Sequence, residues 1–193
     1  MSKEIVFDIE TQNTFADIGS KNDMSKLLVS LVGVYSYETD KYLTFMEDEL
    51  NEMWPLFENA SRLITYNGKH FDLPVLNNYY SGDLLTFNNL DIYEEVEKSS
   101  GKRLKLDHIA KGTLNIGKIG SGLDAIEYWK KGDIDNLKKY CLKDVEITKK
   151  VYEYGLKYSN IFYKNDFGEH GKIDIDFQEK AKNKSKINLT LPF

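Results

Sequence analysis

Apolar residues in the first third of the chain fall into short runs that are typical of strands. The β-forming residues of the segment EIVFDIE predict a strand from Lys3 to Glu10. Two further runs, over residues 27–37 and 41–46, predict a pair of strands joined by a turn at Glu38–Asp40. The polar stretch between residues 11 and 26 is expected to form a loop.

The middle of the chain changes to helical spacing, in which apolar residues recur every three or four positions. Between the first two predicted helices, a short strand at Arg62–Tyr66 leads into an Asn67-Gly68 turn. The predicted helices span Glu47–Ala60, His70–Tyr80, Asp91–Lys98, Leu104–Leu114, Leu123–Lys131 and Ile134–Tyr158. Pro55 is expected to interrupt the first helix, and Pro74 fits the second only in its first turn.

Near the C-terminus, apolar residues alternate with aspartate in the segment IDIDF, residues 173–177, which predicts a half-exposed strand. Residues 161–164 can pair with it as a hairpin across a turn at 168–171. The order of the elements predicts an α/β fold with one mixed sheet flanked by helices. The predicted parts are a main domain over residues 1–158, a hairpin extension over 159–178 and a lysine-spaced tail over 179–193.

The composition narrows the class of protein. A length of 193 residues suits a single domain, and 41% hydrophobic with 30% charged residues excludes wholesale disorder. A single cysteine, Cys141, excludes an internal disulfide and a multi-cysteine zinc site. The longest apolar run, residues 27–35, is too short for a membrane span, and no signal peptide is readable. We therefore expect a cytoplasmic protein with no membrane partner.

The charge balance adds a further constraint. A net charge of −5 argues against a protein that simply coats nucleic acid, because such proteins are usually basic. It is compatible with an enzyme that meets phosphates through bound divalent cations, which carboxylates would hold.

Five residues carry the candidate chemistry. Asp8 and Glu10 stand two apart in the first predicted strand, so their side chains share one face. Asp72 falls in the first turn of a predicted helix. Tyr140 and Asp144 are four apart in the long C-terminal helix, which places them on one helical face.

Each of these signals also has an ordinary structural explanation. An edge strand with a solvated polar face accounts for Asp8 and Glu10, and helix capping accounts for Asp72. A tyrosine on a helix is more often packed in a core than used in a reaction. The combination of the segments, in this order along the chain, is much more specific than any of them alone.

The segments FDIET, N-x-x-x-F-D and Y-x-x-x-D, in that order, resemble the three motifs of the DEDD superfamily of exonucleases, tyrosine subtype. These are DnaQ-like 3′→5′ exonucleases on an RNase H-like fold, and the middle segment is most similar to proofreading domains of family-B DNA polymerases. The resemblance covers about Ile5 to Gly155. It implies an RNase H-like mixed sheet flanked by helices, and a phosphodiesterase that removes nucleotides from a 3′ end.

The resemblance also implies roles for the five residues. Asp8, Glu10, Asp72 and Asp144 would be the ligands of two divalent cations, Mg²⁺ or Mn²⁺, and Tyr140 would orient the attacking water. Oxygen ligands are the ones that these hard cations prefer. Two such cations can stabilise both the attacking and the leaving oxygen of a phosphodiester.

The substrate is less constrained than the chemistry. Asn67 either fixes its loop or contacts the terminal nucleotide, and Phe71 either packs in the core or stacks on a base. Asp91 opens a predicted helix and can cap it, and a role in supporting the site residues is the second option. Single-stranded or frayed DNA is favoured as the substrate over RNA, with trimming of RNA as an alternative. A non-catalytic nucleic-acid-binding or scaffold module on the same fold is the second alternative.

The last six residues, NLTLPF, resemble the hexapeptide that binds bacterial sliding clamps, whose pattern is Gln-Leu-x-Leu-x-Phe. Leu189, Leu191 and Phe193 fall on the apolar positions of that pattern, and Asn188 replaces its glutamine. A bacterial sliding clamp is therefore a candidate partner. The alternative is that residues 187–193 add an edge strand to the protein's own sheet.

Overall fold

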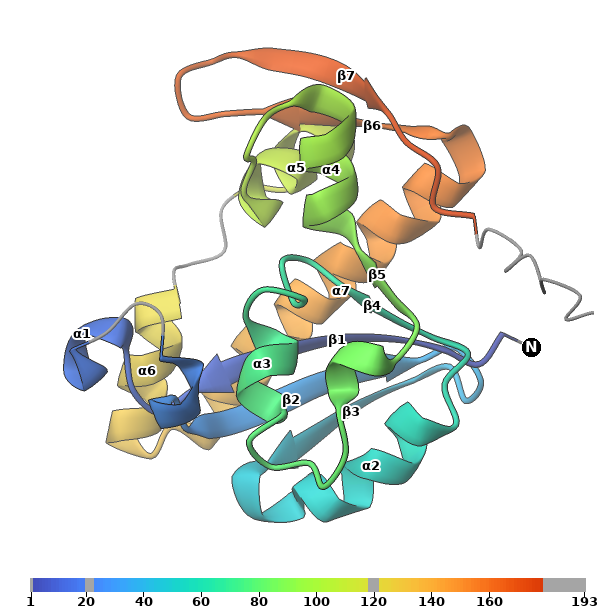
Figure 1. The fold of residues 1–193 in the computed structure, drawn as a ribbon. Coiled ribbons are helices and arrows are strands. Elements are labelled where there is room, and N and C mark those ends of the chain that lie inside the picture. The colour runs from blue at the N-terminus through green and yellow to red at the C-terminus, as the bar shows by residue number, and fades with distance from the viewer. Residues whose placement is uncertain (1, 20–22, 118–121, 179–193) are drawn as a thin grey trace, which may run out of the picture.

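The computed structural model describes residues 2–19, 23–117 and 122–178 (Figure 1). The strands are β1 (Glu4–Thr11), β2 (Val29–Ser36), β3 (Lys41–Met46), β4 (Arg62–Thr65), β5 (Asn89–Asp91), β6 (Asn160–Lys164) and β7 (His170–Asp174). The α-helices are α1 (Phe15–Ile18), α2 (Leu50–Glu58), α3 (Asp72–Leu76), α4 (Ile92–Ser100), α5 (Leu106–Thr113), α6 (Gly122–Lys131) and α7 (Ile134–Tyr158). Three short 3₁₀ turns complete the described elements, at Met24–Lys26, Glu47–Glu49 and Leu84–Thr86.

The central sheet has five strands in the order β3-β2-β1-β4-β5. The pairs β1–β2 and β2–β3 are antiparallel, whereas β1–β4 and β4–β5 are parallel. The predicted α/β architecture with a mixed sheet is therefore confirmed. Its edge strand β5 was not predicted, because three residues, NLD, are too few to show a period.

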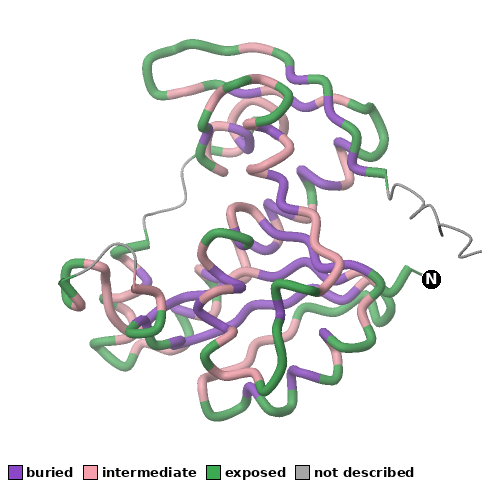
Figure 2. The backbone as a smooth tube through the Cα atoms, in the orientation of Figure 1, coloured by how far each residue is buried: buried purple, intermediate pink, exposed green. Residues whose placement is uncertain are grey.

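Alternation along β1 divides the core between the two faces of the sheet. Phe7 and Ile9 pack with α2 and α3 on one face, whereas Val6 packs with α4 and α7 on the other. Figure 2 shows the inner strands β1, β2 and β4 as the buried centre of the molecule, whereas the edge strand β3 is more exposed. Ile5 and Phe7, on either side of Val6, thus point away from α7. Asp8 and Glu10 come two and four residues after Val6, so their side chains lie on the same face of the sheet as Val6, towards α7.

Helix α7 lies close against β1 and β2 because Gly33 leaves room for it. Gly33 is the cross-strand partner of Asp8. A Cβ at Gly33 would lie 2.8 Å from Cys141 Sγ and 3.1 Å from a methyl carbon of Val145. The absence of a side chain at this position therefore sets how near α7 approaches the strand that carries Asp8.

The helices of the structure differ from the prediction in three places. Residues Phe15–Ile18 form a helix inside the predicted loop, with Thr14 and Asp17 as a capping box. Helix α2 continues through Pro55, so the predicted interruption is wrong; the Pro55 carbonyl still accepts a hydrogen bond from Asn59 N–H at 3.2 Å. The proline costs one hydrogen bond and occurs three residues before the helix ends.

The second predicted helix, His70–Tyr80, is shorter than expected. Its five-residue core, α3, begins at Asp72, because Phe71 has the non-helical angles φ −132° and ψ −66°. Pro74 lies in the first turn, as predicted. After the helix, the Asn77 side chain accepts a hydrogen bond from Leu84 N–H at 2.8 Å, which directs the chain away from a further helical turn.

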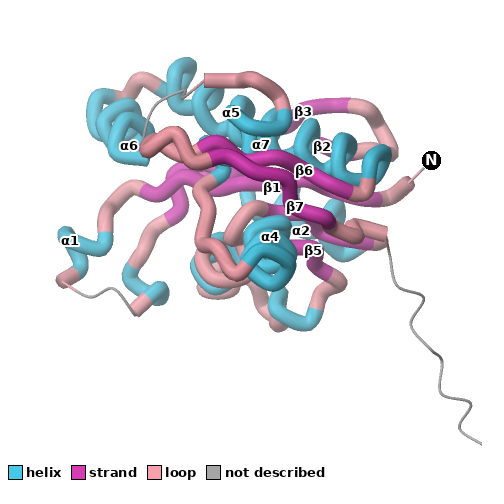
Figure 3. The backbone as a smooth tube through the Cα atoms, turned by 90° about the horizontal axis from the view of Figure 1, so that it is seen from above, coloured by secondary structure: helices cyan, strands magenta, loops and turns pink. Residues whose placement is uncertain are grey.

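A hairpin is present as predicted, with β6 and β7 running side by side (Figure 3). Its predicted bounds are wrong: the turn covers residues 165–169 instead of 168–171, and β7 ends at Asp174, before residues 175–177 of the predicted strand. Helix α5 packs against β6 so closely that a Cβ at Gly112 would lie 2.5 Å from the Tyr163 backbone. The Thr113 hydroxyl donates to the Phe162 carbonyl at 2.7 Å and accepts from the Phe162 N–H at 2.9 Å. Thr113 therefore satisfies the edge of β6 that faces away from β7. The tail over residues 179–193 lies outside the described residues, and the division of the chain into three parts stays a prediction.

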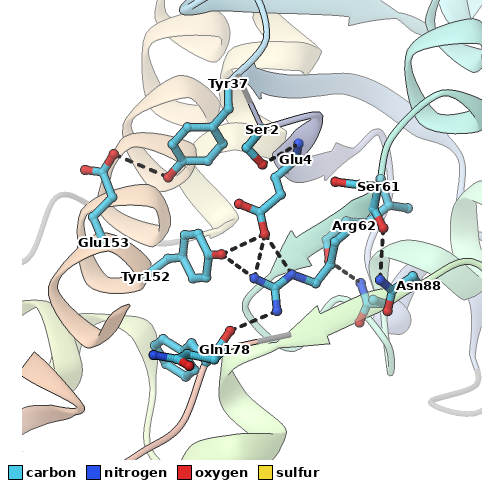
Figure 4. Close-up of polar contacts among 12 residues, drawn as sticks. Ser2, Glu4, Tyr37, Ser61, Arg62, Asn88, Tyr152, Glu153 and Gln178 are labelled. Atoms are coloured by element: carbon cyan, nitrogen blue, oxygen red, sulfur yellow. Dashed lines mark hydrogen bonds and ion pairs between the residues drawn. The ribbon is translucent and has the colours of Figure 1, made fainter. Parts of the chain in front are cut away.

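A buried ion pair ties the end of the described chain to the central sheet (Figure 4). Arg62 on β4 and Glu4 on β1 are register partners, and Arg62 Nε donates to Glu4 Oε1 at 2.9 Å. The Tyr152 hydroxyl donates to the same carboxylate oxygen at 2.8 Å, and a second Arg62 nitrogen donates to the Phe177 carbonyl at 2.8 Å. One arginine thus joins β1, β4, α7 and the segment after β7.

No helix within the described residues combines the length and the apolar character that a membrane crossing requires.

Replacing Arg62 with alanine is expected to lower the free energy of unfolding by roughly 3–5 kcal/mol, because Glu4 would keep a buried charge without a partner. The control is Arg103, the other arginine, which pairs with Glu97 at 2.8 Å but has a 79% exposed side chain. Arg103→Ala should cost less than about 1 kcal/mol. Urea denaturation followed by circular dichroism measures both, and an equally small loss for the two variants would contradict the anchoring role of Arg62.

Candidate active site

A cleft of about 330 Å³ lies at the end of β1 that faces α3 and α6. All seven candidate residues of the predicted nuclease site line it: Asp8, Glu10, Asn67, Phe71, Asp72, Tyr140 and Asp144. They come from β1, the loop after β4, α3 and α7, which are far apart in the sequence. The fold therefore brings the three motifs into one place.

Asp72 reaches β1 through a gap in the sheet. Strand β4 pairs with β1 only over Glu4–Val6, so the later residues of β1 have a free edge on that side. The Asp72 carboxylate accepts a hydrogen bond from the Ile9 N–H at 3.1 Å on that edge. Ile9 lies between Asp8 and Glu10, so this bond places the third carboxylate beside the first two. Helix capping does not account for Asp72, which is buried.

The loop that delivers Asp72 is held by Asp91, at the end of β5. The buried Asp91 carboxylate accepts hydrogen bonds from the N–H groups of Asn67 at 2.7 Å, Lys69 at 2.9 Å and Tyr93 at 2.9 Å. The bond from Tyr93 caps α4, as the sequence indicated. The other two bonds fix the turn after β4, in which Asn67 has the left-handed angle φ 66°. The sequence left a supporting role for Asp91 open but did not identify its partner, because no local pattern connects Asp91 to a loop 24 residues earlier.

Helix α7 covers the cleft from the other side. Tyr140 and Asp144 line the cleft on successive turns of α7. Burial and then the charge of Asp107 raise the pKa of Asp144, and a hydrogen bond from Tyr140 offsets part of that rise. Cys141 is fully buried beneath them, with its sulfur 3.6 Å from the Asp8 carbonyl oxygen. Its burial fits the predicted packing role.

The carboxylates of the cleft are crowded, and their pKa values show it. Burial, followed by the charges of Asp72, Glu10 and Asp144, raises the pKa of Asp8 well above its ordinary value. Burial and then the charges of Asp144 and Asp72 likewise raise the pKa of Glu10. Burial raises the pKa of Asp72 to about 7 and that of Asp144 to about 6. All four groups therefore resist carrying their charges together.

No described side chain supplies the missing positive charge. Neither lysine nor arginine is among the described residues that line the cleft, and no described cation forms an ion pair with any of the four carboxylates. Candidate ligand atoms of Asp8, Glu10 and Cys141 lie within 4.8 Å of one another. A buried, uncompensated set of carboxylate oxygens fits hard divalent cations, whereas the single thiol is a soft ligand.

Two aromatic rings stand at the cleft. Phe71 contacts Phe15 of α1 edge to face, with the ring centroids 5.9 Å apart. Phe15 was not among the predicted site residues. The signal that would have located it is the capping pair Thr14 and Asp17 followed by Gly19, which marks a short helix inside the loop.

Lys69, two residues after Asn67, forms an ion pair with Glu94 at 2.8 Å and does not line the cleft. The docking-peptide residues Leu189, Leu191 and Phe193 lie outside the described residues. Their prediction stays untested.

Comparison with known proteins now decides the family. The model of the RNase H superfamily matches residues 5–155. The chain belongs to the RNase H superfamily. This membership confirms the RNase H-like fold that the sequence motifs implied. It also agrees with the mixed sheet, in which β1, the strand that carries Asp8 and Glu10, is the central strand.

A solved structure shows the same fold in a polymerase. The chain is similar to the family B DNA polymerase from the hyperthermophilic archaeon Pyrobaculum calidifontis, with a TM-score of 0.60 and 19% sequence identity. The similarity covers 79% of this chain and 24% of the polymerase chain, so this member of the RNase H superfamily spans about a quarter of that protein. No curated protein matches the sequence.

The raised pKa values predict how stability depends on pH when no divalent cation is bound. Asp72 and Asp144 titrate near 7 and 6 in the folded chain, against about 3.9 in an unfolded one. Between these values the folded state binds more protons, so raising the pH lowers the free energy of unfolding. The melting temperature in chelator should therefore fall from about pH 5 to about pH 8, and Mg²⁺ or Mn²⁺ should restore it at the higher pH.

The matched variants separate crowding from a general charge effect. At about pH 8 in chelator, Asp8→Asn should raise the melting temperature by roughly 2–8 °C. Glu52→Gln, which removes an exposed carboxylate from α2, should change it little. A melting temperature that rises over the same pH interval, or equal effects of the two variants, would contradict the crowded site.

Proposed function

We propose that this chain is a cation-dependent 3′→5′ exonuclease that hydrolyses the terminal phosphodiester of single-stranded or frayed DNA. The convergence of four carboxylates in one cleft, two of them buried and two half-buried, with no described cation to compensate them, carries the proposal. The three sequence motifs supply the direction of cleavage, because they resemble those of the DEDD exonucleases, tyrosine subtype. Similarity to a DNA polymerase supports DNA over RNA as the substrate.

Asp8, Glu10, Asp72 and Asp144 would hold two divalent cations, Mg²⁺ or Mn²⁺. Such cations supply Lewis-acid activation of water and compensate the charge that develops on the phosphodiester. The chain's part is to hold the four carboxylates in place before the substrate arrives. The bond from Ile9 N–H to Asp72, and the loop that Asp91 fixes, perform this function for the second motif.

Tyr140 would orient the attacking water rather than remove its proton. Burial, and then the charges of Asp144, Glu10 and Asp8, raise the pKa of Tyr140 above its ordinary value of 10. A phenol with a raised pKa stays protonated at neutral pH, so it is a poor general base and a good hydrogen-bond donor.

The terminal nucleotide would enter between the carboxylates and the two aromatic rings. Phe71 and Phe15 offer ring surfaces at the cleft on which a base can stack. Asn67 lines the same cleft from the fixed turn after β4, within reach of the sugar or base. Stacking on a ring does not distinguish one base from another, which suits an enzyme that removes any nucleotide.

The direct test is digestion of 5′-labelled and 3′-labelled DNA oligonucleotides with Mn²⁺, resolved by electrophoresis. The 5′-labelled strand should give a ladder that shortens one nucleotide at a time, and the 3′ label should appear first as a mononucleotide. Asp8→Asn or Asp144→Asn should slow cleavage by roughly 10³-fold or more, which is about 4 kcal/mol of transition-state stabilisation. Tyr140→Phe should keep cation affinity and slow cleavage by roughly 10–100-fold.

Internal fragments without a ladder would show endonuclease action and would contradict the proposal. Full activity of Tyr140→Phe would remove the assigned role of the tyrosine. Glu52→Gln serves as the control, because it removes an exposed carboxylate that does not line the cleft, with the same change in charge.

We also propose that the terminal hexapeptide NLTLPF docks on a bacterial sliding clamp. The sequence pattern alone supports this partner, through the apolar residues Leu189, Leu191 and Phe193. Docking on a clamp would raise the local concentration of the enzyme at replicating DNA. A chain truncated after Lys186 should keep its activity on free oligonucleotides and lose retention on clamp-coated resin. Equal retention of the full and truncated chains, or retention of neither, would contradict docking.

A further inference from the structure

A second groove lies between α5 and the hairpin of β6 and β7, outside the candidate active site. It has a volume of about 460 Å³, and we call it the hairpin groove. Its chemically distinctive lining residues are the cationic or titratable Lys111, Lys164, His170 and Lys172 and the aromatic Phe162 and Tyr163. No carboxylate is among its described lining residues, although the whole chain carries 31 acidic and 26 basic residues.

The register of the hairpin gathers these side chains on one face. Phe162 pairs with Lys172 across the strands, and Lys164 pairs with His170. Because side chains of a strand alternate between faces, these four residues share the outer face of the hairpin. The opposite face carries Ile161 and its neighbours, which are buried in the core. The outer face thus presents the side chains of Lys164, His170 and Lys172 beside the half-buried ring of Phe162.

The carboxylates near the groove already have partners. Glu169 forms an ion pair with Lys102 and accepts a hydrogen bond from the Tyr163 hydroxyl at 3.0 Å. Asp174 lies 2.7 Å from Lys172. In contrast, neither Lys111 nor Lys164 forms an ion pair or a side-chain hydrogen bond with any described residue. Two lysine charges therefore remain uncompensated in the groove.

Helix α5 connects the hairpin groove to the candidate active site. Asp107, in its first turn, lies near enough to Asp144 for its charge to raise the pKa of that group. Lys111 is four residues further along, on the same face of the helix and about 6 Å away. A nucleic-acid strand that ran from the cleft along α5 would therefore pass Lys111 first and then reach the hairpin.

The tip of the hairpin presents one more aromatic ring. Phe167 is 96% exposed, in the turn between β6 and β7. The Asn165 side chain accepts hydrogen bonds from the Phe167 N–H at 3.1 Å and the Glu169 N–H at 2.9 Å, which fixes this turn. A phenyl ring held in water on an ordered turn, beside cations, is suited to stacking on an unpaired base.

We propose that the hairpin groove binds the phosphate backbone of a single-stranded nucleic acid, several nucleotides from the end that enters the cleft. This inference rests on the proposed function. Lys111 and Lys164 would neutralise phosphates, and Phe167 would stack on a base beyond them. A single strand is the occupant that the charge and the exposed rings favour together, because bases paired in a duplex are not free to stack on a side chain.

The first test measures binding of a fluorescent 12-nucleotide oligo-dT by anisotropy, in the full-length Asp8→Asn protein so that no cleavage interferes. Adding Lys111→Gln and Lys164→Gln should weaken binding by roughly 5- to 20-fold. It should also reduce the slope of log Kd against log salt by about 1.4, the value for two phosphate contacts to a single strand. The control pair, Lys41→Gln with Lys139→Gln, removes two exposed lysines elsewhere and has the same net charge.

Phe167→Ala provides a variant that cannot act through folding, because the side chain is exposed. It should leave the melting temperature unchanged and weaken binding of the 12-mer by roughly 5-fold or more. A dinucleotide, which is too short to reach the groove, should bind all of these variants alike. The proposal would be overturned if the control pair weakened binding as much as the pair Lys111→Gln with Lys164→Gln. It would also be overturned if neither that groove pair nor Phe167→Ala weakened binding. Binding of a 12-residue polyglutamate peptide as tightly as oligo-dT would overturn the nucleic-acid assignment.

A second readout separates this inference from the proposed function. With Asp8 intact, hydrolysis of the p-nitrophenyl ester of thymidine monophosphate tests the cleft alone. The groove pair should match the wild type on this ester and be slower on the 12-mer. If the wild type hydrolyses neither substrate, the proposed function fails, while the anisotropy result still decides whether the groove binds a single strand.

Discussion

Repulsion among four carboxylates at the end of β1 is the constraint on which the arrangement of this protein depends. Asp8, Glu10, Asp72 and Asp144 come from three segments, and burial raises the pKa of each. A fold gains nothing by itself from such a cluster, because each charge disfavours the others. The rest of the core must therefore hold the carboxylates together against this repulsion, and the bound cations that we propose would relieve it.

The scaffold meets this constraint through contacts outside the cleft. Gly33 lets α7 approach the strand that carries Asp8, and Arg62 joins β1 and β4 to the end of α7. The early end of the β1–β4 pairing leaves the Ile9 N–H free for Asp72, and Asp91 fixes the loop between them. A gap in the sheet is thus part of the site, because a longer β4 would occupy the edge of β1 that Asp72 uses.

Much of this could be predicted from local patterns. A period of two places Asp8 and Glu10 on one face, and helical spacing gives the bounds of α7 correctly. The contacts that could not be predicted are those made by single polar residues with distant backbone groups. The pattern identifies Asp91 as a helix cap and leaves its supporting role without a named partner, and Arg62 reads as one polar residue in a short strand. Their partners lie up to 115 positions away, so no periodicity in the sequence reveals them.

The central claim is that the crowded carboxylates hold divalent cations. Calorimetric titration of the full chain with Mn²⁺, in two buffers of different ionisation enthalpy, tests it most directly, because it counts both the bound cations and the protons they displace. We predict two Mn²⁺ ions per chain, with release of at least about one proton near pH 6.5, the contribution of Asp72 and Asp144 alone, and with fewer protons released as the pH rises. Binding with no proton release at either pH, or no binding of Mn²⁺, would contradict the account.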